Sequence, residues 1–391
     1  MQTAAYLYPW DVVGDPAAAD LAAGLGVDHV VLAAVYHATR ALTPRHPRHR
    51  VVVAPRTAAY YPVEPARWRG ARLSPAPADW MDGADPFGAA VVALRAAGVP
   101  VHAWVVCGHV DPPAGSAESG ESVVNAYGDR YPWALCPARD AVVEYALGLA
   151  EDVAALPGID GVELEACGWY GFDHLSAHDK TGGVALSGAT QYLMSLCFCD
   201  ACHDAYRAGG IDPEALRERV RAALDAGFAG LVAASPADET AHIAELLGAD
   251  LAAAVAEVRL AVADRLRAAM TGRIRQRRPE LAVLLHASPR QHSTIAFTGV
   301  DPARSAGLAD GLVVNCHAGP AAVPPSLAGG PVYASLQAVA GMGGRPDELP
   351  AQAEAARAAG ASGVRLYHAG LAGAADLAAI RALTAVINER E

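Results

Sequence analysis

The chain has 391 residues, of which 53% are hydrophobic, and a formal net charge of −12 at pH 7. That apolar content is enough for a large core. An acidic chain without a basic run is a poor match for nucleic acid or an anionic membrane, so we expect neither as a partner, and a neutral small molecule or oligosaccharide instead. These properties leave open whether the chain forms a homo-oligomer.

Eight short apolar runs follow one another along the chain, separated by segments with a helical pattern. They cover residues 3–9, 28–36, 100–107, 159–166, 281–287, 310–316, 331–337 and 362–368. Most runs are continuous rather than alternating, which is typical of parallel strands covered on their outer face. Helical segments end in Gly before the next run, a helix C-cap signal.

The eight repeats predict an α/β fold, a (β/α)8 TIM barrel that spans residues 1–391 as a single domain. An open doubly wound sheet is the alternative. We favour the barrel because no glycine-rich dinucleotide-binding turn follows the first run.

Two connections are long, at residues 37–80 and 167–280. Both follow the C-terminal end of a predicted strand, the face on which barrels build active sites. We expect residues 37–70 to cover the mouth of the barrel.

Targeting signals are not evident in the sequence. No apolar stretch approaches the ~20 residues of a membrane span. The first residues lack a basic segment followed by an apolar one, so we predict no signal peptide. We therefore expect a cytoplasmic protein whose thiols stay reduced.

The longer insertion holds the motif CFCDAC, with Cys197, Cys199 and Cys202 inside six positions of a chain that has seven cysteines. Reduced, clustered thiols favour metal binding, and zinc prefers four tetrahedral ligands. A group of buried thiols without metal is the alternative. The spacing leaves the fourth ligand open among Cys107, Cys136, Cys167, Cys316 and His203.

The segment LCPARDAVVEYALGLAEDVAALPGIDGVELEA (135–166), followed by CFCDACHDAY (197–206), resembles family 42 β-galactosidases and related glycoside-hydrolase barrels. These have a Cys-Pro step before a helix, an Asp-Gly step into the fourth strand and a C-x-C-x-x-C cluster. The resemblance implies one structural Zn²⁺ that staples the insertion between the fourth strand and the fourth helix. The ligands it implies are Cys136, Cys197, Cys199 and Cys202.

Glu163 and Glu165 lie two positions apart in the fourth predicted strand, so their side chains share one side of it. Carboxylates on the outer side would meet helices at a cost. We therefore expect both inside the barrel, with Glu165 nearest the mouth as acid/base or nucleophile. A structural ion pair is the alternative. In the resembled family the carboxylate of this strand follows an Asn, which is absent here.

Glycoside hydrolysis usually needs a second carboxylate. Asp173, in the loop after the fourth strand, is our first choice, and Glu163 is the other candidate. Polar and aromatic side chains at the strand ends predict a sugar pocket. They are Tyr8, Trp10, His37, His102, Trp104, Trp169, His286, Asn315, Tyr367 and His368.

The sequence thus predicts a glycoside hydrolase acting on a small glycoside or oligosaccharide. A sugar isomerase, epimerase or lyase that uses Glu and His, with or without a divalent metal, is a second hypothesis. A carbohydrate-binding barrel without activity is the third.

Overall fold

Eight parallel strands form a closed barrel in the computed structural model, which describes residues 1–111, 120–172, 179–229, 238–305, 307–319 and 330–389. The strands are β1 (Gln2–Leu7), β2 (His29–Tyr36), β6 (Val101–Val106), β9 (Gly161–Glu165), β10 (Ala282–Ser288), β12 (Gly311–Asn315), β13 (Val332–Gln337) and β14 (Gly363–Tyr367). The barrel closes because β1 pairs with both β2 and β14. The predicted TIM barrel and its eight strands are confirmed.

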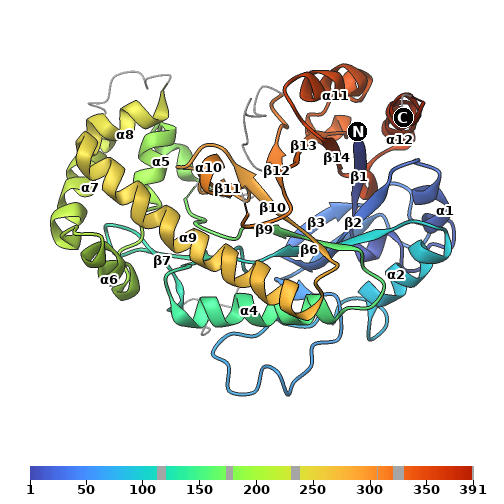
Figure 1. The fold of residues 1–391 in the computed structure, drawn as a ribbon, viewed down its shortest axis with the longest axis horizontal. Helices are drawn as coiled ribbons and strands as arrows, with labels where there is room; N and C mark the ends of the chain where they lie inside the picture. Colours follow the sequence, from blue (N-terminus) through green and yellow to red (C-terminus); the bar gives the residue numbers. More distant parts are fainter. Residues whose placement is uncertain (112–119, 173–178, 230–237, 306, 320–329, 390–391) are drawn as a thin grey trace.

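Continuous burial along the strands reflects packing on two sides. Every residue of β2, β6 and β9 is buried, because helices cover the outside while side chains fill the inside. The helices that follow the strands are α1 (Ala18–Ala23), α2 (Pro86–Ala96), α4 (Asp140–Ala155), α9 (Ala249–Arg277), α10 (Pro302–Ser305), α11 (Leu349–Ala358) and α12 (Ala374–Asn388). Figure 1 shows the long α9 running beside α4.

The first long connection forms a hairpin above the barrel. Strands β3 (Thr39–Leu42) and β4 (Val51–Ala54) pair antiparallel, and β5 (Ala58–Ala59) pairs antiparallel with the end of β2. Arg45, in the turn of the hairpin, donates hydrogen bonds to the carbonyls of Ala369 and Ala372, just after β14. The turn of the hairpin is therefore held against the segment that follows the last barrel strand.

The second long connection is helical. It contains α5 (Gly188–Met194), α6 (Asp200–Ala208), α7 (Pro213–Phe228) and α8 (Glu239–Leu247) before α9 returns to the barrel. Figure 1 shows these four helices gathered on one side of the molecule. A second hairpin, β7 (Ser122–Val124) with β8 (Arg130–Leu135), reaches toward them, and a two-residue strand β11 (Thr298–Gly299) extends the sheet beside β10. Within the described ranges, none of the helices combines the length and the apolar character needed to cross a bilayer.

Candidate active site

A cavity of about 660 Å³ lies at the C-terminal ends of the barrel strands. Tyr6, Tyr8, Tyr36, Trp104, Phe297 and Tyr367 give it aromatic walls, and Glu165, His37, His286, Asn315, His317 and Gln337 add polar groups. Thr39, Arg40, Ala41 and Leu42 of the β3–β4 hairpin close one side. A concave site with aromatic walls and a few polar groups is typical of small-molecule binding.

Glu165 is the last residue of β9 and is only 6% exposed. Its Oε2 accepts a hydrogen bond from Trp104 Nε1 at 2.9 Å, and lies 3.0 Å from His286 Nδ1. Both contacts are made by the same oxygen. The second oxygen, Oε1, is therefore the one that can meet a ligand in the cavity.

The backbone turns sharply directly after Glu165. Ala166 has a φ of 55°, a left-handed conformation that side chains other than Gly adopt at a cost. The turn is held because Ala166 N–H donates to Ala296 O and Ala166 O accepts from Gly108 N–H. A Cβ at Gly108 would lie 2.6 Å from Ala166 O, so a glycine is needed here. These contacts fix where β9 ends and where Glu165 points.

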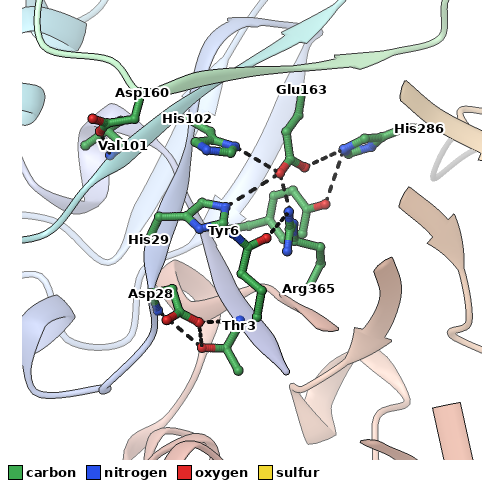
Figure 2. Close-up of polar contacts among 11 residues, drawn as sticks. Thr3, Tyr6, Asp28, His29, Val101, His102, Asp160, Glu163, His286 and Arg365 are labelled. Atoms are coloured by element: carbon green, nitrogen blue, oxygen red, sulfur yellow. Dashed lines mark hydrogen bonds and ion pairs between the residues drawn. The ribbon is translucent and has the colours of Figure 1, made fainter. Parts of the chain in front are cut away.

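Glu163 lies deeper in the barrel and is completely buried. Its Oε1 accepts from Arg365 Nε at 2.9 Å and lies 3.4 Å from His102 and 3.8 Å from His29, as Figure 2 shows. Burial alone would raise the pKa of this carboxyl, but Arg365 and the histidines outweigh burial and hold it well below its usual range. Glu163 is thus an ionised group inside the barrel, and it does not line the cavity.

His286 connects the two carboxylates. Its Nε2 lies 3.0 Å from Glu163 Oε2 and 3.3 Å from the Tyr6 hydroxyl (Figure 2). Its Nδ1 lies 3.0 Å from Glu165 Oε2. Burial would lower the pKa of the imidazole, but the two carboxylates outweigh it and raise the pKa to about 9. At neutral pH the ring is therefore an imidazolium that donates from both nitrogens.

Charges thus alternate along one line from the core to the cavity. Arg365 is positive, Glu163 negative, His286 positive and Glu165 negative, and each contacts the next. Buried charges are tolerated when each is paired and hydrogen-bonded. The line gives Glu165 a rigid support.

The predicted catalytic and substrate-binding residues other than Glu163, whose position is given above, fall into three groups. Glu165, Tyr8, His37, Trp104, His286, Asn315 and Tyr367 line the cavity together. Trp10, His102, Trp169 and His368 do not: Trp10 and His368 each stack on Tyr8 at 4.3 Å, His102 lies in the layer of Glu163, and Trp169 packs on Arg259. Asp173 lies outside the described residues.

The sequence-based prediction did not include some of the aromatic residues that line the cavity. Tyr36 is the last residue of β2, and its place at a strand end is a signal that could have found it. Tyr6 lies inside β1, and Phe297 sits in the loop after β10, where only tertiary contacts bring it to the cavity.

The four cysteines Cys136, Cys197, Cys199 and Cys202 come together away from the cavity lining, and all are buried. Cys136 Sγ lies 3.7 Å from Cys199 Sγ and 3.4 Å from Cys202 Sγ. Tetrahedral Zn–S bonds of ~2.3 Å place sulfurs ~3.8 Å apart. The Val124 N–H donates to Cys197 Sγ, as expected around a thiolate. The four side chains thus fit one metal ion, and Cys136 is the fourth member of the set.

The remaining candidates for the fourth position lie elsewhere. Cys107 and Cys167 pair with each other, with their Sγ atoms 3.0 Å apart. His203 Nδ1 lies 3.8 Å from Glu214.

No protein-family model and no curated protein sequence matches this chain. Solved structures do share its fold. β-Galactosidase from Bacillus circulans sp. alkalophilus superposes with a TM-score of 0.57 at 12% identity, over 100% of this chain and 56% of that one. The catalytic domain of β-amylase from Paenibacillus polymyxa gives 0.56 at 11% identity, over 100% and 98%.

α-L-Fucosidase isoenzyme 2 from Paenibacillus thiaminolyticus gives a TM-score of 0.54 at 15% identity, over 99% of this chain and 49% of that one. The chain thus spans about half the length of the fucosidase and somewhat more of the β-galactosidase. At these identities the likeness concerns the fold alone, a (β/α)8 barrel.

Proposed function

We propose that the protein is a glycoside hydrolase that uses Glu165 as a catalytic carboxylate. The observation that carries the proposal is the position of Glu165 at the C-terminal end of the fourth barrel strand, where it lines the cavity and where Trp104 and His286 hold its Oε2. Catalytic groups of TIM barrels come from such strand ends.

The cavity walls suit a sugar. Tyr8, Tyr36, Trp104 and Tyr367 offer aromatic faces for the apolar side of a sugar ring, and Asn315, His317 and Gln337 offer hydrogen bonds to hydroxyls. Two donors on Oε2 suit a carboxylate that attacks the anomeric carbon or stabilises its developing positive charge. Asp173 remains our candidate for the second carboxylate.

The test compares hydrolysis of a panel of 4-nitrophenyl glycosides by the wild type and by Glu165→Gln. We expect kcat on the best substrate to fall by ~10²–10⁴, the usual cost of removing a positioned acid or base. Glu64→Gln, which removes an exposed carboxyl in the 37–80 connection, is the matched control and should leave kcat unchanged. A Glu165→Gln variant within about threefold of the wild type would exclude this role.

A second candidate function is sugar isomerisation, epimerisation or elimination. It is favoured because Glu165 is paired with His286 and is the one carboxylate among the described lining residues. Proton NMR of free sugars incubated with the protein separates the classes. A new sugar without bond cleavage indicates an isomerase or epimerase, an unsaturated product indicates a lyase, and binding without turnover in both wild type and Glu165→Gln indicates a binding protein.

We also propose that the cysteine cluster holds a structural Zn²⁺. Four buried sulfurs leave no open ligand position, so the ion would stabilise the fold rather than take part in chemistry. It would join Cys136, after the β7–β8 hairpin, to the start of α6. The cytoplasmic location that we predict would keep the thiols reduced.

Elemental analysis of dialysed protein should give about one zinc per chain. Cys136→Ser should lose the zinc and much of the thermal stability, because a structural zinc contributes directly to folding. Cys316→Ser, at a buried cysteine outside the cluster, is the control and should keep the zinc. A metal-free protein of full stability would contradict the proposal.

A further inference from the structure

We propose that His37, His109 and Asp111 form a second metal site, for a divalent transition-metal ion, in the wall of the cavity. One ligand atom from each of the three lies within 4.8 Å of the others. The inference does not depend on glycosidase activity, because it concerns binding of an ion by these three side chains.

The three residues come from neighbouring strand ends. His37 directly follows β2, and His109 and Asp111 follow β6, which is paired with β2 in the barrel. The rings of His37 and His109 lie 4.1 Å apart. His37 lines the cavity, so an ion held here would face the same space as Glu165.

Each candidate ligand is oriented by a second contact. His37 Nδ1 lies 2.8 Å from Ala38 O, and because a carbonyl only accepts, Nδ1 carries the proton and Nε2 the lone pair. Ala38 N–H donates to Asp111 Oδ2 at 2.7 Å, so one backbone residue positions two ligands. Metal-binding histidines and carboxylates are usually held by such outer contacts.

Thr57 and Tyr170 also contact the candidate ligands Asp111 and His109. The Thr57 hydroxyl lies 3.4 Å from Asp111 Oδ2, and it accepts from Asp111 N–H at 2.8 Å. The Tyr170 ring stacks on His109 at 4.7 Å, with its hydroxyl 3.4 Å from Nδ1. The side chains are therefore preorganised rather than loosely grouped.

Charge distinguishes this group from the other His-His-carboxylate group of the barrel. There, Glu163 is neutralised by Arg365 at 2.9 Å, and a dication beside that guanidinium would be repelled in a sealed core. Within the part of the chain that the structure describes, the side chain of Asp111 contacts only neutral groups of Ala38 and Thr57, so its negative charge is available to attract a cation.

The donor set indicates the class of ion. Two imidazoles and one carboxylate suit Zn²⁺, Mn²⁺, Fe²⁺ or Co²⁺, and three protein ligands leave coordination positions open to water or to the hydroxyls of a sugar. The cysteine cluster, by contrast, offers soft thiolates that Mn²⁺ binds poorly. Mn²⁺ can therefore report on the cavity site without occupying the cysteine cluster.

The experiment titrates Mn²⁺ into the 391-residue protein as purified and follows free Mn²⁺ by electron paramagnetic resonance. We expect one saturable site per chain, with electron spin-echo modulation from two imidazole nitrogens. His37→Ala and Asp111→Asn should each raise the Kd at least about tenfold, and Thr57→Val, which removes only an outer contact, should raise it by about tenfold. His49→Ala, which changes a histidine outside the group, should leave the Kd unchanged.

Two results with the wild type would overturn the proposal: no saturable Mn²⁺ binding, or bound Mn²⁺ without nitrogen modulation. An unchanged Kd in both His37→Ala and Asp111→Asn would also overturn it, because the ion would then sit elsewhere. If a variant does not fold, the spectrum of the wild type still decides. These measurements follow only Mn²⁺ binding. A protein without this metal site can therefore be distinguished from a protein without hydrolase activity.

Discussion

Glu163→Gln should destabilise the protein strongly, although Glu163 does not line the cavity. The change keeps the shape of the side chain and removes its charge. Arg365 then remains in the core without a counter-ion, since a guanidinium does not deprotonate at any ordinary pH. His286 also loses one of its two carboxylates.

The expected magnitude follows from the geometry of the pair. Arg365 Nε and Glu163 Oε1 are 2.9 Å apart, and both side chains are 0% exposed. At an effective dielectric constant of about 20, two unit charges at this distance attract by about 6 kcal/mol. Since the introduced amide would keep a neutral hydrogen bond and the carboxylate no longer has to be desolvated, we expect a net loss of about 3–5 kcal/mol, the usual cost of breaking a buried pair.

Urea unfolding at pH 7, followed by circular dichroism, measures this loss. Glu165→Gln is the matched control: it should cost less than half as much, because His286 keeps its contact with Glu163 and, unlike the guanidinium of Arg365, can release its proton. The double variant Glu163→Gln/Arg365→Met should be at least about 1 kcal/mol more stable than the sum of the single effects predicts. Single variants that each cost under about 1 kcal/mol, or effects that simply add, would refute the line of alternating charges.

Two further predictions concern pH and the hairpin. The two carboxylates raise the pKa of His286 from 6.5 to about 9, so the stability that this imidazolium adds to the folded state is complete below pH 6.5 and is lost as the pH rises through 9. The shift corresponds to about 3 kcal/mol of unfolding free energy. Unfolding curves of His286→Gln should lack this loss at alkaline pH. Burial lowers the pKa of His368 to about 3, which makes stability fall below pH 6.5 instead, so we expect a maximum near that pH. Arg45→Ala should raise KM while changing Tm little, because it releases the hairpin from Ala369 and Ala372. A large drop in Tm with an unchanged KM would argue against a role of the hairpin in binding.

The sequence by itself determined the barrel and the cysteine set. Eight apolar runs, most of them continuous and separated by helical segments, favour a closed parallel sheet over an open one. The spacing of Cys197, Cys199 and Cys202 indicated one metal ion, while Cys136 followed only from the family resemblance. Strand parity also placed Glu163 and Glu165 on the inner side of β9, because successive side chains alternate between the two faces.

Only the tertiary structure decided what the two carboxylates do. Glu163 is neutralised by Arg365, 202 positions away in the chain, and His286 from β10 joins it to Glu165. Local patterns cannot reveal such contacts, because the depth of a side chain inside a barrel depends on the tilt and stagger of all eight strands. For the same reason Trp169, which the sequence predicted to contact the substrate, packs on Arg259 of α9. Residues 37, 109 and 111 likewise meet only because β2 and β6 are neighbours in the closed sheet.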